Sequence, residues 1–310
     1  MASLANAATL GVLCAVAYVV LHHWWPPIGR RPPQGLRRRF VFFGDSIIGN
    51  AWSECGWLAH LASIYKRTAD VTNRGYNGYN SRWALHVLPH LFRDSALSAP
   101  SLVGICLGAN DAILPPPLAG RSPAASRHHV PIDEYEQNLR AIIAASLATG
   151  ACVLVMTPPP TDGLAWLAFE RRTKPEPPIR EHAESTRSNE ATGAYAARAV
   201  RVAKEFSGVA VVDLWSAMQE RQPRAWGSFF SDGVHPNVEG ATVIFELVRD
   251  TIATHFPELR PAGSEGGMLF DFPDHCSIDE LDPARSFEQW EARRRMRLAE
   301  WPTRNHHMSC

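Results

Sequence analysis

The chain has 310 residues, which is enough for one large α/β domain or two small ones with a substantial core. Hydrophobic residues make up 45% of it, a normal share for globular proteins, so disorder of the whole chain is excluded. Lys plus Arg and Asp plus Glu are equal, at 31 each. Since no excess of positive charge draws the protein toward phosphate groups, we expect no nucleic-acid partner.

An almost wholly apolar run occupies residues 4–21. Its length is just enough for a membrane-spanning helix, which needs about 20 residues, and Trp24 and Trp25 suit the membrane interface. No Lys or Arg precedes the run, whereas five arginines lie between residues 30 and 39. The positive-inside tendency therefore predicts a membrane anchor that leaves the rest of the chain facing the cytoplasm. A secretory signal peptide and an interfacial or mobile N-terminal helix stay open, with a secretory or cytoplasmic location.

After a Pro- and Arg-rich stretch, short apolar runs alternate with longer helix-period segments. This alternation predicts an α/β fold with a parallel sheet covered on both faces. Gly150 is expected to end one helix just before the next strand. The predicted strands are 39–43, 102–107, 152–157 and 209–214, with 71–73 as a weaker fifth, and the predicted helices are 57–66, 82–91, 132–149, 189–206 and 237–255.

Two segments, 115–131 and 158–188, are too long to be simple connections and are predicted to be functional or disordered loops. The second carries an apolar patch that includes Trp166 and Phe169. This patch is equally consistent with an apolar wall at the mouth of a site and with the core of the loop itself. Beyond residue 257 the chain turns acidic and then basic, and the sequence leaves open whether this extension packs on the domain.

Six cysteines are scattered through the chain, and none forms a C-x-x-C pair. Cys106 and Cys152 lie inside apolar runs that are predicted to be buried strands. We therefore expect free thiols in a reducing compartment, with Cys106 and Cys152 as small core residues, rather than a disulfide framework, a zinc site or a catalytic cysteine.

Gly44-Asp45-Ser46 directly follows the first predicted strand. A serine at a strand-to-helix turn places its hydroxyl at the carboxyl edge of the sheet, where open α/β folds bind ligands. The amides of the following helix add positive potential that helps a developing anion. The structural alternative is that Ser46 merely caps the helix, which is common at such turns.

A second polar group, Gly108-Ala109-Asn110-Asp111, follows the strand at 102–107. The neutral amide of Asn110 can donate a hydrogen bond to an oxyanion, whereas a carboxylate there would repel it. An ordinary tight turn explains the same residues equally well.

A third group, residues 231–236, precedes the last predicted helix and contains Asp232 and His235. A histidine that acts as a base needs a carboxylate on its other nitrogen, which fixes the tautomer and stabilises the imidazolium. Asp232 can reach His235 if Gly233 lets the loop curl. The alternative is an Asp-Gly turn beside a surface histidine, one of 13 in the chain.

No G-x-S-x-G, H-E-x-x-H, P-loop or G-x-G-x-x-G motif occurs. Asp45, Asp111 and Asp232 could together suggest a metal cluster, but hydrogen bonding or capping explains each of them more simply. We therefore expect neither a cofactor nor a metal.

Together, the motifs GDSI at 44–47, AND at 109–111 and SDGVHP at 231–236 resemble the GDSL family of the SGNH-hydrolase superfamily. Within it, the chain is similar to the isoamyl acetate-hydrolysing esterase group, which it also resembles at 73–84, 129–139 and 213–219. The resemblance implies a flavodoxin-like three-layer α/β/α sandwich with about five parallel strands, the SGNH-hydrolase fold. The resemblance covers roughly residues 39–256, the expected hydrolase domain. Composition divides the rest of the chain into an apolar segment at 1–25, a linker at 26–38 and a charged extension at 257–310.

By matching motif, the resemblance implies that Ser46 is the nucleophile and that Asp232 and His235 complete a catalytic triad. It implies an oxyanion hole built from the Ser46 amide, the Asn110 side chain and the Gly78 amide, with Gly75 as an alternative to Gly78. We expect a serine esterase that hydrolyses small alkyl, acetyl or lipid-derived esters through an acyl-enzyme. The alternatives are a deacetylase of a polar or glycan substrate and a non-catalytic interaction protein on a hydrolase scaffold.

Overall fold

The computed structural model describes residues 37–53, 56–92, 99–115, 127–173 and 184–299. The apolar run at 4–21, and with it the predicted anchor, lies outside these ranges, as does most of the predicted linker. Within the described ranges, no helix combines the length and apolarity needed to cross a membrane.

Five parallel strands form a single sheet in the order β2-β1-β3-β4-β5, which is the flavodoxin-like order. All five predicted strands are present. The weakest of them is a full seven-residue edge strand, β2, whose side chains are mostly half-buried, so its apolar pattern is weak. The strands are β1 (Arg38–Gly44), β2 (Ala69–Gly75), β3 (Leu102–Cys106), β4 (Cys152–Met156) and β5 (Val209–Val212).

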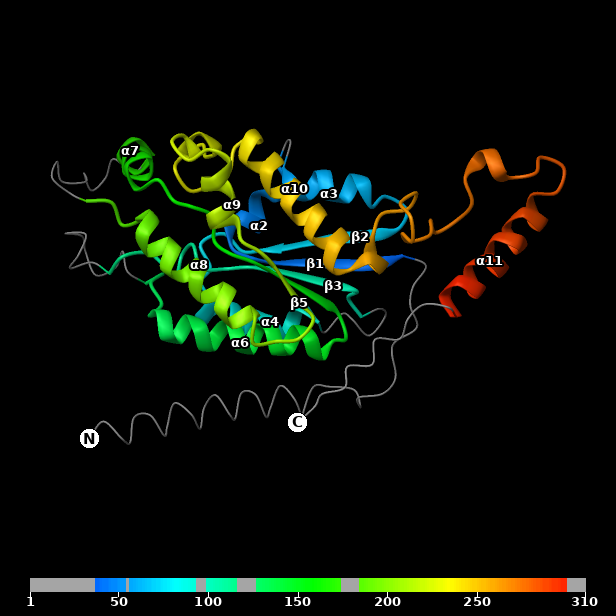
Figure 1. The fold of residues 1–310 in the computed structure, drawn as a ribbon, viewed down its shortest axis with the longest axis horizontal. Coiled ribbons are helices and arrows are strands. Elements are labelled where there is room, and N and C mark those ends of the chain that lie inside the picture. The colour runs from blue at the N-terminus through cyan, green and yellow to red at the C-terminus, as the bar shows by residue number, and fades with distance from the viewer. Residues whose placement is uncertain (1–36, 54–55, 93–98, 116–126, 174–183, 300–310) are drawn as a thin grey trace, which may run out of the picture.

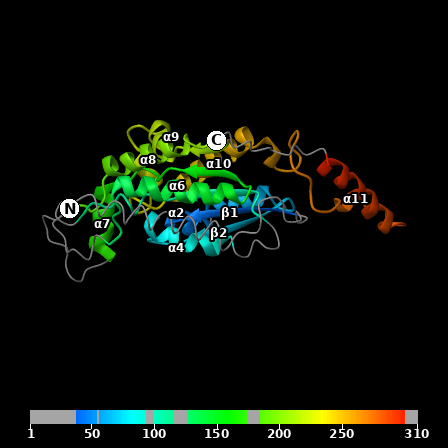
Figure 2. The ribbon, with the colours of Figure 1, turned by 90° about the horizontal axis from the view of Figure 1, so that it is seen from below.

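Helices cover both faces of the sheet and bury a separate apolar cluster on each (Figure 1). Seen from below, α6 runs across one face with α8 and α4 on either side of it (Figure 2). The helices on that face are α4 (Ser81–Leu91), α6 (Ile132–Ala148) and α8 (Asn189–Ala203), and those on the other are α3 (Trp57–Ile64), α9 (Leu214–Arg221) and α10 (Val238–His255). The three-layer α/β/α sandwich is therefore confirmed.

Residues near the helix ends account for the end of α6 and the start of α9. Gly150, at φ +79°, lies directly after the last residues of α6, as predicted. The predicted strand at 209–214 is too long by two residues, because the Asp213 side chain accepts a hydrogen bond from the Ser216 N–H and so caps α9.

A helix also interrupts the segment 158–188, which was predicted to be a long loop. This helix, α7 (Gly163–Thr173), buries Trp166 and Leu167 and leaves Leu164 81% exposed. The Asp162 carboxylate accepts hydrogen bonds from the N–H groups of Leu164 and Ala165 at the start of the helix. The loop prediction was wrong here because the three prolines and the charges around α7 concealed a short amphipathic helix.

The first part of the C-terminal extension packs on the domain. Leu259 and Met268 are buried in the core cluster that contains α3 and α10. Asp271 forms ion pairs with Arg37 and Arg67, near the amino ends of β1 and β2. Beyond it, α11 (Pro283–Ala299) projects from the domain (Figure 1).

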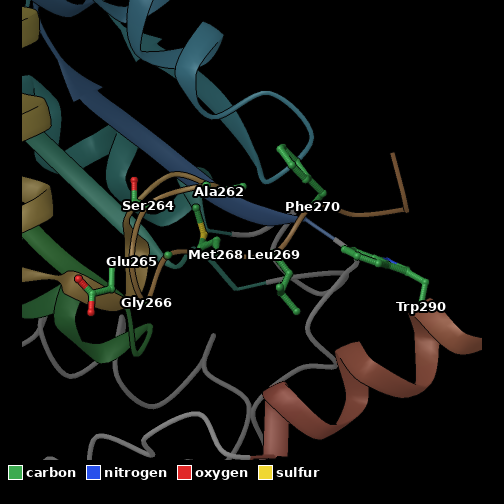
Figure 3. A pocket seen from close by; sticks show the side chains of 10 residues that line it. Ala262, Ser264, Glu265, Gly266, Met268, Leu269, Phe270 and Trp290 are labelled. Carbon is green, nitrogen blue, oxygen red and sulfur yellow. The ribbon is translucent and has the colours of Figure 1, made fainter. Parts of the chain in front are cut away.

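A hollow lies between this extension and α11, lined by residues 262–270 and Trp290 (Figure 3). The Trp290 indole donates a hydrogen bond to the Asp271 carbonyl. Because Asp271 pairs with Arg37 and Arg67, the hollow lies at the amino edge of the sheet. Parallel α/β sheets carry their ligand sites at the opposite, carboxyl edge.

Candidate active site

The sheet register brings two of the three motifs together. Gly44, the last residue of β1, lies level with Gly75 at the end of β2 and with Cys106 at the end of β3. Ser46 and Asn110 follow within a few residues, so both lie at the carboxyl edge of neighbouring strands. Chain connections diverge from β1 to the two sides of the sheet at this position, the topological switch point at which such folds bind ligands.

Ser46 is the first residue of a four-residue helix, α2 (Ser46–Gly49), and is 7% exposed. Asp45 caps this helix, since its Oδ1 accepts a hydrogen bond from the Ile47 N–H at 2.9 Å. The alternative that Ser46 serves as the helix cap is therefore wrong. Its hydroxyl is instead 2.9 Å from the Nε2 atom of His235.

His235 and Asp232 lie in one turn before α10. The His235 Nδ1 atom is 2.6 Å from Asp232 Oδ2. The other carboxylate oxygen of Asp232 accepts hydrogen bonds from the N–H groups of Val234 and His235, at 2.9 and 2.8 Å. The structure thus joins Ser46, His235 and Asp232 in a single hydrogen-bonded chain, although 189 positions separate the serine from the histidine.

Gly233 makes this turn possible. It has φ +92°, which strains any residue with a Cβ atom. A Cβ atom there would also lie 2.4 Å from the Asp162 carbonyl oxygen and 2.8 Å from the Trp166 nitrogen. Both atoms lie at the start of α7, so the turn that carries Asp232 and His235 packs directly against that helix.

Two buried carboxyl groups lie at this site, Asp45 next to Ser46 in sequence and Asp232 beside His235, and their surroundings shift their pKa values in opposite directions. Burial raises the pKa of Asp232, but hydrogen bonds from the His235 ring and backbone outweigh it and leave this pKa below its ordinary value. For Asp45, burial dominates and raises the pKa to about 6 despite the Ile47 N–H. Asp232 is therefore suited to stay ionised beside the imidazole.

Asn110 is 4% exposed, and both the nitrogen and the oxygen of its side-chain amide form hydrogen bonds. Nδ2 donates to the Tyr79 carbonyl oxygen at 2.9 Å, which places Asn110 against the loop that contains Gly78. The Gly75 N–H, by contrast, already donates to Asn73 Oδ1 at 2.8 Å. Of the two glycines suggested for the oxyanion hole, Gly78 therefore lies beside Asn110, whereas Gly75 has its amide occupied.

One residue at this site has no counterpart among the sequence predictions. Arg187, 8% exposed, donates to the Ala109 carbonyl oxygen and to Asn110 Oδ1, and it stacks on the Trp166 ring at 4.8 Å. The Trp166 ring centroid is 6.2 Å from that of His235. Nothing in the sequence distinguishes Arg187 from the other charges of segment 158–188.

A hydroxyl, an imidazole and a carboxylate in this order can generate an alkoxide nucleophile, and a nearby amide can stabilise the oxyanion that follows its attack. Comparison with known proteins assigns the chain to a family. The chain matches the GDSL-like lipase/acylhydrolase family over residues 42–243. It belongs to that family. It is accordingly a carboxylic ester hydrolase, as predicted, and the reading as a non-catalytic interaction protein is set aside.

Curated members of the GDSL family are similar over most of the chain. A GDSL esterase/lipase of Arabidopsis thaliana is 38% identical over 257 residues, which are 82% of this chain and 99% of that protein. The human isoamyl acetate-hydrolyzing esterase 1 homolog is 35% identical over 211 residues, covering 67% of this chain and 78% of that protein. The predicted resemblance to both groups is confirmed.

Solved structures share the GDSL hydrolase's fold. A lipase/acylhydrolase from Enterococcus faecalis superposes with a TM-score of 0.52 at 22% identity, covering 73% of this chain and all of that one. The acetylxylan esterase Axe2 from Geobacillus stearothermophilus gives a TM-score of 0.51 at 21% identity, over 72% of this chain and 96% of that one. The likeness at this level of identity is one of fold.

Proposed function

We propose that this GDSL hydrolase cleaves small carboxylic esters through an acyl-enzyme on Ser46. The observation that carries the proposal is the hydrogen-bonded chain from the Ser46 hydroxyl through His235 to Asp232, at 2.9 and 2.6 Å. His235 takes the serine proton as the oxygen attacks the ester carbonyl, and then gives it to the leaving alcohol. Water repeats the sequence and releases the acid, while Asp232 holds the imidazole tautomer.

In this proposal, the oxyanion of each tetrahedral intermediate binds three donors: the Ser46 amide, the Gly78 amide and the Asn110 side chain. Asn110 Nδ2 carries two hydrogens, and the Tyr79 carbonyl takes one of them. The other remains to bind an oxyanion. The occupied amide of Gly75 favours Gly78 as the backbone donor.

For the substrate, we propose a short-chain alkyl or acetyl ester, with lipid-derived esters as the wider class. Two observations support it: the similarity to a protein named as an isoamyl acetate-hydrolyzing esterase homolog, and the apolar side chains of α7 beside His235. Trp166 packs against Phe169 at 5.4 Å between ring centroids, and Leu164 is 81% exposed on the same helix. Rates on p-nitrophenyl esters of increasing acyl length test this. We expect the highest kcat/KM at short chains, whereas a maximum at long chains would refute the short-chain proposal in favour of a lipid-derived ester.

The nucleophile is tested by replacing Ser46 with alanine. We expect S46A to lose labelling by a fluorophosphonate probe and hydrolysis of p-nitrophenyl acetate, while its thermal unfolding stays close to that of wild type. The matched control is S53A, because Ser53 is exposed and its hydroxyl bonds only to the nearby Asn50 carbonyl in the described structure. Labelling and turnover of S46A at the S53A level would refute the assignment.

We also propose that the chain attaches to a membrane through residues 4–21, with the hydrolase on the cytoplasmic side. The support is the length of the apolar run, the tryptophans after it and the arginines beyond them. Placing two arginines in the run (V12R/V16R) should release the full-length protein from the membrane fraction, since each costs about 3 kcal/mol at the centre of a spanning helix. Equal membrane retention of this variant and wild type would contradict the proposal.

A further inference from the structure

Arg187 reaches the proposed oxyanion hole from a distant part of the chain. It directly precedes Ser188, whose side chain caps α8, whereas Asn110 follows β3 on the other side of β4 in sequence. Its guanidinium donates to two successive groups of the Asn110 turn, the Ala109 carbonyl oxygen at 2.5 Å and Asn110 Oδ1 at 2.9 Å. A planar guanidinium that donates to a backbone oxygen and a side-chain oxygen at the same time fixes the positions of both.

These contacts determine which way the Asn110 amide points. Arginine can only donate hydrogen bonds, so the atom that faces Arg187 must be the amide oxygen. The Tyr79 carbonyl on the other side can only accept, so the atom that faces it must be the amide nitrogen. If the amide were rotated by 180°, its nitrogen would face the Arg187 donor and its oxygen would face the Tyr79 carbonyl, and both hydrogen bonds would be lost. With Arg187 in place, Nδ2 is therefore the atom available to an oxyanion.

We propose that Arg187 is a positioning residue of the esterase, which locks the Asn110 amide in its donating orientation and polarises it for the oxyanion. The inference rests on the proposed function, because it gives Asn110 its assigned role. A cation bound to the amide oxygen draws electron density from the amide nitrogen, which makes its N–H a stronger donor. Arg187 does not itself touch the substrate in this scheme.

The burial of Arg187 indicates that its charge matters most in the transition state. Burial lowers its pKa to about 10, so it remains a cation at neutral pH. Its Nε atom is buried without a hydrogen-bond partner among the described residues, and one face of the guanidinium is covered by Trp166. A partly compensated buried cation is costly in the resting enzyme. Negative charge that develops on an oxygen bound to Asn110 Nδ2 strengthens the hydrogen-bonded chain from that oxygen through the amide to Arg187, so the benefit falls on kcat rather than KM.

The test compares R187M, which removes the charge and both hydrogen bonds, with R187K, which keeps the charge but not the fork. The matched control is R198M, because Arg198 is a partly buried arginine on α8 that pairs with Glu136, away from the site. We expect kcat for p-nitrophenyl acetate to fall about 10–100-fold in R187M and less in R187K, with KM nearly unchanged. R198M should keep the wild-type kcat.

A double-mutant cycle with N110A separates positioning from a general structural role. N110A alone should lose about 10²–10³ in kcat. Adding R187M to it should cost little more, because Arg187 acts through the group already removed. Losses that multiply, or a wild-type kcat in R187M, overturn the inference. If R187M does not fold, R187K decides: a lowered kcat with a normal melting temperature supports the inference, and a wild-type kcat overturns it. A wild-type kcat in N110A would instead refute the proposed oxyanion hole itself.

Discussion

Replacing Gly233 with alanine perturbs the turn that joins Asp232 to His235 at a single point. The added Cβ atom would lie 2.4 Å from the Asp162 carbonyl oxygen and 3.0 Å from the Ala165 Cβ atom. Gly233 also has φ +92°, where an L-residue is strained. Two separate penalties therefore act at the same residue, one steric and one conformational.

The chain contains a glycine that separates these penalties. Gly263 has a similar φ of +87°, but a Cβ atom there meets nothing within 4 Å. G263A should therefore lose only the conformational part, about 1–2 kcal/mol of the free energy of unfolding. G233A should lose that amount plus about 1–3 kcal/mol for overpacking against α7. The expected total for G233A is about 2–5 kcal/mol.

Urea unfolding measures the stability difference, and p-nitrophenyl acetate hydrolysis measures its effect on the site. Relief of the clash requires the turn and the start of α7 to move apart, and a movement of the turn disturbs the 2.9 Å contact between His235 and Ser46. We therefore expect kcat to fall in G233A, under conditions in which it is folded, and to stay at the wild-type value in G263A. Equal stability losses in the two variants, or full activity in G233A, would show that the turn is not held as argued.

Two further predictions concern the buried carboxylates. Asp232→Asn should lower kcat about 10⁴-fold with little change in folding, because an amide nitrogen facing His235 Nδ1 favours the wrong tautomer; a loss below tenfold in steady-state assays would count against the triad. Asp45 has a pKa raised to about 6, so its contribution to stability is complete below pH 4 and declines as the pH rises through 6. Relative to Asp45→Asn, wild type should thus lose up to about 3 kcal/mol between pH 4 and 7 in urea titrations, and a constant difference across that range would contradict the shift.

The parts of the fold that sequence predicts best are those in which one segment carries its own signal. The strands β1, β3 and β4 are buried on both faces and read as continuous apolar runs. Because parallel strands end at a common edge, the sequence alone predicts that the motifs following β1 and β3 lie close together. The Asp232–His235 pair is equally predictable from sequence, since a three-residue spacing and a glycine are enough to close the turn.

The features that sequence did not predict depend on contacts between distant segments. The helix α7 has a weak pattern because Trp166 and Leu167 face inward while exposed and charged residues surround them. Arg187 carries no local signal at all. Its partners, Ala109 and Asn110, lie beyond β4 and α6 in the chain, and only the folded sheet brings them within hydrogen-bond distance.

These two unpredicted features join the two halves of the site. The first half, the turn that carries Asp232 and His235, is bound to the start of α7 where the Asp162 N–H donates to the Gly233 carbonyl oxygen at 2.8 Å. The second half, the turn that carries Asn110, is bound to α7 through Arg187, which stacks on Trp166. The Trp166 ring thus contacts both the guanidinium that binds Asn110 and the imidazole that is hydrogen-bonded to Ser46. A fold that only aligned the strand ends would bring these polar groups to one edge, whereas α7 and Arg187 add the contacts that hold them in place relative to one another, as the proposed chemistry requires.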